Sequence, residues 1–220
     1  MIKKFYLWLL KATSKPKEKN EYSKGHWQNA IREKVTSLCG GINGKILEVG
    51  CGEGLFLEHL AQEKPNLELW GIDNSQIRIN EAQSKKKAGD LTNLNFAVED
   101  ATKLSFSDGS FEAVVCINVL FNLPSIELLK QVLKEMRRVC KTSGKIYFDF
   151  RNALNPLLFL KYRLAPFYDE TVKDLPLKTY SQKQISDILK DLDIKIINKS
   201  YIGLPFKLFA PIVIIEAERC

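Results

Sequence analysis

Three glycines at alternate positions follow a short apolar segment in the first quarter of the chain. Gly50, Gly52 and Gly54 come directly after Ile46–Val49, whose apolar residues predict a buried strand, and a helical pattern begins at Leu55. Glycine permits positive φ angles and lets a ligand lie against bare backbone. The N-terminus of the helix offers unpaired N–H groups to an acceptor on that ligand. The chemistry that this arrangement supports is the binding of a nucleotide-like cofactor.

The glycine spacing distinguishes this loop from other nucleotide sites. It is Gly-x-Gly-x-Gly, with the acid Glu48 two residues before the first glycine. It is neither the Gly-x-Gly-x-x-Gly of most dinucleotide sites nor a P-loop, which ends in Gly-Lys-Ser/Thr. Cys51 is interpreted as a small residue that fits a crowded turn at the cofactor, rather than as a nucleophile. The segment resembles motif I of the class I S-adenosylmethionine-dependent methyltransferases, and the resemblance extends over about residues 26–220, more specifically in the first two-thirds.

A second predicted strand, 67–73, ends in Asp73, which lies about 20 residues after the glycines. At that distance an α/β unit presents a carboxylate to ribose hydroxyls, and a carboxylate can accept two hydrogen bonds from a diol. We assign Asp73, with Asn74 beside it, to the cofactor. Capping of the next helix by Asp73, Asn74 or Ser75 is the alternative, and both roles can hold together.

Two further strands end in residues that the resemblance assigns to the cofactor. The segment 94–101 ends in Asp100 and Ala101, which would meet the adenine amino group and a ring nitrogen. An ordinary acid at a strand end remains the alternative for Asp100. The segment 111–118 is nearly all apolar, as expected of a strand buried on both faces. Its last residue, Asn118, would line the methionine part of the cofactor through the backbone.

The remaining elements complete an α/β pattern. Residues 126–139 predict a covering helix, Thr142–Gly144 a turn where the family usually has Pro-Gly-Gly, and Ser181 the cap of a later helix. The last two strands are predicted at 194–199 and 210–218. The resemblance implies a Rossmann-like three-layer sandwich with a seven-stranded, mostly parallel sheet, in the order 3-2-1-4-5-7-6 with strand 7 antiparallel. Ligand is expected at the carboxyl ends of the strands.

The resemblance implies in-line displacement, in which an acceptor atom attacks the methyl group of S-adenosylmethionine and S-adenosylhomocysteine leaves. Proximity and alignment supply much of the rate, and some members also need a general base. Asp149 and Arg151 share one face at the end of the fifth strand. Asp149 is the candidate proton acceptor and Arg151 the candidate for holding an acidic substrate group, with a local ion pair as the alternative. His26, in a segment that borders the acceptor in this family, is a third catalytic candidate, and a packing role is its alternative.

The chain is expected to comprise a basic N-terminal arm and linker, 1–25, and a single methyltransferase domain, 26–220, with an acceptor-site lid at about 152–180. The formal net charge is +7, and residues 1–34 hold nine Lys or Arg against three acids. Residues 1–11 have two open interpretations. Their aromatic side chains pack on the domain, or they make peripheral membrane contact while their lysines meet anionic head groups. No apolar run approaches the length of about 18–20 residues that a membrane span needs.

Composition narrows the function classes. Five scattered cysteines without Cys-x-x-Cys, and only two histidines, argue against a metal site and favour a reducing, cytoplasmic compartment. The apolar lid favours a small-molecule or lipid-like acceptor. Nucleic acid is not expected as a partner, because the basic excess lies before the fold. An RNA or protein methyltransferase that uses the arm, a non-catalytic cofactor-binding scaffold and a nicotinamide oxidoreductase remain alternatives, and the oligomeric state is open.

Overall fold

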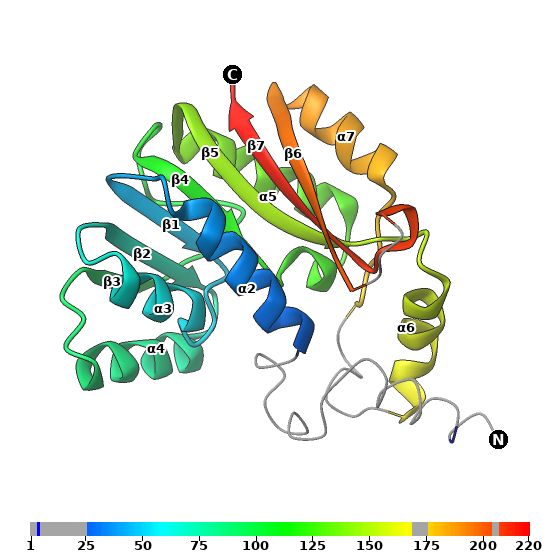
Figure 1. Ribbon diagram of the computed structural model, residues 1–220, viewed down its shortest axis with the longest axis horizontal. Helices are drawn as coiled ribbons and strands as arrows, with labels where there is room; N and C mark the ends of the chain where they lie inside the picture. Colours follow the sequence, from blue (N-terminus) through cyan, green and yellow to red (C-terminus); the bar gives the residue numbers. More distant parts are fainter. Residues whose placement is uncertain (1–3, 5–25, 169–175, 204–206) are drawn as a thin grey trace.

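A seven-stranded sheet in the order β3-β2-β1-β4-β5-β7-β6 runs through the centre of the molecule (Figure 1). The computed structural model describes residues 4, 26–168, 176–203 and 207–220. Its strands are β1 (Lys45–Val49), β2 (Glu68–Asp73), β3 (Leu94–Val98), β4 (Phe111–Cys116), β5 (Cys140–Arg151), β6 (Ile194–Ile202) and β7 (Ile212–Arg219). β7 pairs antiparallel with β5 and β6, and the other pairs are parallel. The predicted fold class, strand order and antiparallel last strand are confirmed.

Helices cover both faces of this sheet (Figure 1). They are α2 (His26–Cys39), α3 (Leu55–Glu63), α4 (Gln76–Ala88), α5 (Ile126–Val139), α6 (Pro156–Tyr168) and α7 (Gln182–Asp191), with the short 3₁₀ turns η3 (Leu120–Asn122) and η5 (Lys207–Phe209). α2, α3 and α4 share one core cluster, and α5 and α7 share the other. The molecule is therefore the expected three-layer α/β sandwich.

Strand side chains alternate between the two clusters. Along β1, Leu47 and Val49 pack in the cluster of α5 and α7, whereas Ile46 packs in the cluster of α2 and α3. β4 is buried on both faces from Ala113 to Cys116, which is why its sequence is apolar throughout instead of alternating. The polar side chains that remain in these strands are therefore informative, since burial makes each of them costly.

Two predicted helices begin where the sequence indicated. The Ser125 hydroxyl accepts from the Leu128 N–H at the start of α5. Ser181 forms a reciprocal capping box with Gln184 at the start of α7, in which each side chain bonds the other residue's backbone N–H. Each cap satisfies an N–H group that lacks an intrahelical partner and contributes about 1 kcal/mol.

Strand ends differ from the predicted ones by a few residues. β5 begins at Cys140, because Cys140 pairs with Phe111 while the next partner of β4 is Lys145. The predicted turn lies between these two pairs, outside the paired register of β4 and β5, and its residue Ser143 has a φ of 59°. β6 continues to Ile202, three residues beyond the expected end, because its partner β7 supplies a ladder as far as Ile212.

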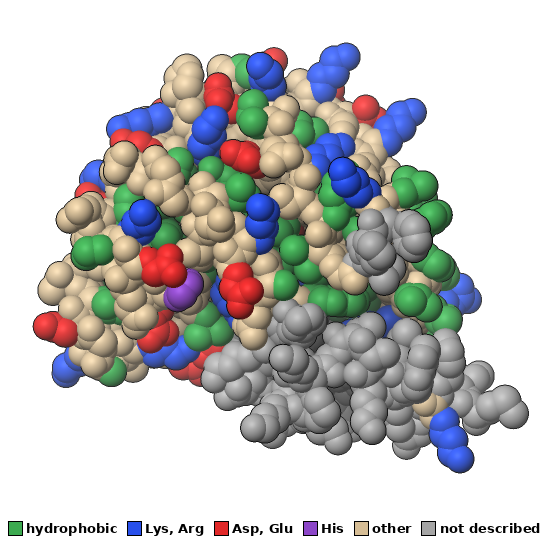
Figure 2. All heavy atoms as spheres, viewed as in Figure 1, with side chains coloured by type: hydrophobic (Ala, Val, Ile, Leu, Met, Phe, Trp, Pro, Cys, Tyr) green, Lys and Arg blue, Asp and Glu red, His purple; other side chains and the backbone are tan. Residues whose placement is uncertain are grey.

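The region predicted as a lid, 152–180, contains α6 and a parallel bridge between Asn152 and Tyr180. Residues 169–175 and all of the arm except Lys4 lie outside the described part, so the lid and the domain boundary at 25 stay predictions. Hydrophobic side chains gather along the edge of the molecule near η5 and the start of α6 (Figure 2). Among the described helices, none has the length and apolar character needed to cross a bilayer.

Candidate cofactor and acceptor site

The sequence-predicted cofactor residues meet at one edge of the sheet. Gly50 follows β1, Asp73 ends β2, Asp100 follows β3 and Asn118 follows β4. Because these four strands are parallel, their carboxyl ends lie at the same edge. Arg151 ends the neighbouring strand β5 at this edge too. The topology thus brings together residues that are about 100 positions apart in the sequence.

The glycine loop after β1 has the backbone that only glycine adopts readily. Gly50, Gly52 and Gly54 have φ angles of 75°, 52° and 79°. A methyl group on Gly50 would lie 2.3 Å from Val119 Cγ2, and one on Gly54 would lie 2.9 Å from Phe96 Cζ. No heavy atom lies within 4 Å of the corresponding position on Gly52. The protein's own packing therefore accounts for the first and third glycines, whereas the second presents bare backbone to open space.

Asp73 joins this loop to the next helix. Its Oδ2 accepts from the Gly52 N–H at 2.9 Å, and its Oδ1 accepts from the Ser75 N–H at 3.0 Å. Ser75 is the N-cap of α4 and accepts from the Arg78 N–H, and Asn74 beside it is exposed. The capping role weighed for this segment is therefore present. The half-buried carboxylate keeps further lone pairs, since each oxygen carries two, so the ribose role remains compatible with these bonds.

Asp100 is exposed after β3 and is held by a local turn. Its Oδ1 accepts from both the backbone N–H and the hydroxyl of Thr102, each at 2.8 Å. These two bonds lower the pKa of the Asp100 carboxyl below its ordinary value, so the group is ionised at neutral pH. Ala101 beside it is half-buried against the core. An ionised acceptor at this edge suits the amino group of a nucleobase.

Asn118 is fixed in a left-handed conformation by two charged neighbours. Its φ is 61°, an angle that Asn tolerates better than most residues. Its N–H donates to Asp149 Oδ1 at 2.6 Å, and its Oδ1 accepts from Arg151 at 3.1 Å. Arg151 also donates to Asp149 Oδ2. The side chains of Asp149 and Arg151 are 0% and 3% exposed, so the local ion pair that the sequence offered is confirmed, and the catalytic role of either residue stays a prediction.

The same arginine reaches α6. Its guanidinium lies 4.2 Å from the ring centroid of Phe121 and hydrogen-bonds the Tyr162 hydroxyl. Phe121 and Tyr162 stack with centroids 6.5 Å apart. Burial raises the pKa of Asp149 and of Tyr162, in each case against the lowering effect of Arg151. Arg151 therefore connects the end of β4 with the helix in the predicted lid.

Glu48, the acid of the glycine motif, lies on the face of the sheet that α2 covers, near Arg32. It is 3% exposed, and its Oε2 has no hydrogen-bond partner in the described part of the chain. Burial raises its pKa well above the ordinary value, outweighing the attraction of Arg32. Burial also raises the pKa of the Cys51 thiol, with Glu48 adding to the effect. A protonated, 7% exposed thiol agrees with the interpretation of Cys51 as a packing residue.

Glu48→Gln is expected to change the pH dependence of folding. A carboxyl whose folded pKa exceeds its unfolded value of about 4.3 stabilises the fold below that pH, and this contribution is lost as pH rises through the folded pKa. Wild type should therefore lose stability relative to the variant as pH rises above that unfolded value, by up to about 1.4 kcal/mol per pH unit, which a comparison of about pH 5 with about pH 8 would reveal. Urea unfolding at both pH values measures the difference. The exposed Glu63→Gln serves as the control, and parallel pH curves for Glu48→Gln and wild type would contradict the assignment.

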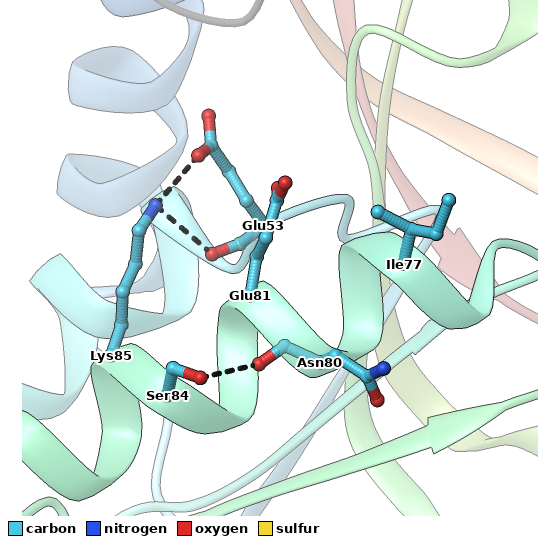
Figure 3. Close-up of a pocket in the computed structure, with 6 residues that line it drawn as sticks. All are labelled: Glu53, Ile77, Asn80, Glu81, Ser84 and Lys85. Carbon is cyan, nitrogen blue, oxygen red and sulfur yellow. Dashed lines mark hydrogen bonds and ion pairs between the residues drawn. The ribbon is translucent and has the colours of Figure 1, made fainter.

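Two contacts at the glycine loop were not predicted from the sequence. Lys85 of α4 donates to Glu53 Oε2 at 2.8 Å and to the Glu53 carbonyl at 3.3 Å, which ties the loop to the helix (Figure 3). Ile77, in the first turn of α4, is 72% exposed. Both lie on an open hollow of about 490 Å³, which is lined by Glu53, Ile77, Asn80, Glu81, Ser84 and Lys85. The sequence signal that could have identified Ile77 is an apolar residue in the otherwise polar first turn of α4.

The third catalytic candidate, His26, is the first residue of α2. Its side chain lies outside the described residues. Its proposed catalytic role therefore stays a prediction.

Part of the chain is similar to proteins of known function. Residues 46–144 match the model of a methyltransferase domain family. The chain is 34% identical to a demethylmenaquinone methyltransferase of Thermotoga maritima, covering 52% of this chain and 47% of that protein. It is 29% identical to a ubiquinone biosynthesis O-methyltransferase of Coxiella burnetii, covering 58% and 52%. The chain thus spans about half the length of the curated relatives that it matches.

Solved structures share the fold over most of the chain. A magnesium protoporphyrin IX methyltransferase from Synechocystis with bound S-adenosylhomocysteine superposes with a TM-score of 0.69 at 22% identity, covering 87% of this chain and 83% of that one. A protein of Pyrococcus horikoshii gives the same TM-score and identity with 99% of each chain covered. The matched segment, residues 46–144, carries the glycine loop, and the sheet has the expected order, so both findings agree with the predicted resemblance to the class I S-adenosylmethionine-dependent methyltransferases.

Proposed function

We propose that this protein transfers the methyl group of S-adenosylmethionine to a small-molecule or lipid-like acceptor. The observation that carries the proposal is the conformation of Gly52, with positive φ, open space where a side chain would stand, and an N–H held by Asp73. The positive φ by itself favours glycine, and because the packing of the described residues leaves the space beside Gly52 open, a ligand can lie against its bare backbone.

The residues at this edge fit the nucleoside donor. Asp73 would accept from the ribose hydroxyls and Asp100, through its second oxygen, from the adenine amino group. Ile77 offers an exposed apolar surface for the base beside them. Asn118, held by Asp149 and Arg151, would present backbone to the methionine part. The candidate site therefore offers at least one group to each part of the donor, namely the ribose, the adenine and the methionine part.

Bound S-adenosylmethionine supplies an electrophilic methyl group that an acceptor atom can displace from sulfur in line. The protein's task is to align the two reactants, since alignment supplies much of the rate when the methyl group is already activated. The buried Asp149–Arg151 pair contributes by fixing Asn118 in its left-handed conformation. We infer that its principal role is positioning, and the proton acceptor suggested for Asp149 is the alternative.

The acceptor is inferred to have an apolar part. α6, in the predicted lid, brings Tyr162 to the Arg151 cluster and is predominantly apolar along its length. The names of the relatives concern demethylmenaquinone and ubiquinone biosynthesis, which supports a quinone-like aromatic acceptor. The matching segments span about half of those proteins, so the identity of the acceptor is part of the proposal.

Calorimetric titration with S-adenosylmethionine, followed by assays with a methyl-labelled donor, tests the proposal. We expect saturable binding of the donor and label transfer to hydroxylated quinone precursors, in preference to bulk RNA. Transfer to RNA that disappears when residues 1–25 are deleted would favour the alternative nucleic-acid acceptor. Binding without transfer to any acceptor class would favour a scaffold, and binding of NADH in place of S-adenosylmethionine would end the proposal.

A further inference from the structure

One edge of the molecule exposes large apolar side chains instead of burying them. They lie at the start of α6, along its outer side and on η5, and are Leu154, Leu157, Phe159, Phe167, Leu208 and Phe209, between 44% and 77% exposed. We call this surface the α6–η5 face. Single exposed hydrophobic residues are ordinary, but a continuous group of them marks an interaction surface.

Hydrogen bonds hold the two parts of the face together. The Asn155 side chain donates to the Phe209 carbonyl at 2.6 Å, and the Asn152 side chain donates to the carbonyls of Leu208 and Ala210, each at 2.9 Å. Asn152 and Asn155 are 0% and 2% exposed, so these bonds form in the interior. The relative placement of η5 and the start of α6 is thus fixed, and the face is a feature of the fold.

The charged side chains on the described part of this face all have one sign. Lys161 and Arg163 lie on α6 and Lys207 on η5, and the segments 152–168 and 207–211 contain no acid. Arg163 and Lys207 are exposed, and Lys161 lies 5.3 Å from the centre of the Trp27 ring. Large apolar side chains among cations, without acids, are the composition of a surface that enters the head-group region of an anionic membrane.

We propose that the α6–η5 face docks on the surface of an anionic lipid bilayer. Charge complementarity selects this occupant over the two others. A second copy would bring cations against cations, which disfavours a symmetric dimer through this face. The segment 1–34 is itself basic, with nine Lys or Arg against three acids, so it adds to the positive charge instead of neutralising it. A membrane with acidic lipids can accept the apolar side chains and the positive charge of this face together.

The docking surface would lie on the helix that also contacts the candidate site. Tyr162, on the inner side of α6, meets the Arg151 cluster, while Phe159 and Arg163 are exposed. If the proposed function holds, a lipid-like acceptor would reach the site from the bilayer along this helix. The docking itself does not depend on methyl transfer.

Cosedimentation of the full chain with vesicles tests the inference. We expect binding to vesicles of equal parts phosphatidylglycerol and phosphatidylcholine, at least tenfold weaker binding to pure phosphatidylcholine, and loss of binding in about 1 M salt, where the Debye length is about 3 Å. The double variant Leu208→Ser/Arg163→Glu should lose at least tenfold in vesicle affinity. Phe159→Ser provides an independent single change and should weaken binding severalfold.

The matched control carries the same kinds of change on other elements. Ile197→Ser/Lys130→Glu replaces an exposed residue of β6 and a lysine of α5, and should bind vesicles like wild type. Wild type that stays in solution, or a Leu208→Ser/Arg163→Glu variant that binds as tightly as the control, would overturn the inference. A dimer in sedimentation equilibrium that this variant dissociates would assign the face to a second copy instead. Titration of each variant with S-adenosylmethionine distinguishes a failure of docking from a failure of the proposed function.

Discussion

Gly52→Ala is expected to weaken the binding of S-adenosylmethionine at least tenfold, which corresponds to about 1.4 kcal/mol. The new methyl group would project into the space beside the loop, where no protein atom lies within 4 Å and where the proposed ligand would contact the backbone. The folded protein has room for it and bears only the strain of a left-handed alanine, about 1 kcal/mol. That strain should lower Tm by about 2–4 °C in a chain of this size. Calorimetry and thermal unfolding measure the two effects.

Two other glycines provide the controls. Gly109 has a similar φ of 65°, and the nearest atom to an added methyl group is Lys141 Cα at 3.9 Å, before β4 and away from the site. Gly109→Ala should therefore cost the same stability and leave donor affinity unchanged. Gly50→Ala should destabilise the fold more strongly, because its methyl group would collide with Val119. Equal donor affinity in Gly52→Ala and Gly109→Ala would remove the main support for the proposed function.

The sheet could be predicted because its signals are local. Each of the first strands is a short apolar run that ends in a glycine or an acid, and the glycine motif indicates a fold family whose strand order is known. Ser181 could be identified as a cap from its own neighbours, and the structure confirms it. Strand ends were harder to predict, since the last three residues of β6, which extend beyond the expected end, are ordered by pairing with β7.

The polar contacts at the site could be predicted only in part. The Asp149–Arg151 pair lies within one strand, so the alternation of side chains indicated it. The contact between Lys85 and Glu53 and the approach of Tyr162 to Arg151 depend instead on how α4 and α6 pack against the sheet. Periodicity shows that a helix covers a sheet, but not which residue of the helix stands opposite a given strand end.

Arg151→Met is expected to destabilise the fold by about 3–5 kcal/mol at neutral pH. Asp149, with a side chain that is 0% exposed, would lose its counter-ion and keep backbone N–H donors, among them that of Asn118. Methionine can fill much of the same space against Phe121, so the loss would come mainly from an unpaired buried charge. Without Arg151, which lowers the pKa of Asp149, that pKa rises further above its unfolded value of about 3.9. The loss should therefore shrink as pH falls toward 4, where protonation removes the charge.

The double variant Asp149→Asn/Arg151→Met separates the charge from the packing. An asparagine amide can still accept from the Asn118 N–H, so the double variant should recover most of the stability that Arg151→Met loses, without its pH dependence. Asp149→Asn alone also tests catalysis, because loss of a general base typically costs 10²–10⁴-fold in kcat. If Asp149 acts by positioning Asn118, donor affinity should fall in step with stability and kcat should change little. If Arg151→Met destabilises the fold by under about 1 kcal/mol, or if the loss does not depend on pH, then the buried ion pair does not stabilise this part of the site.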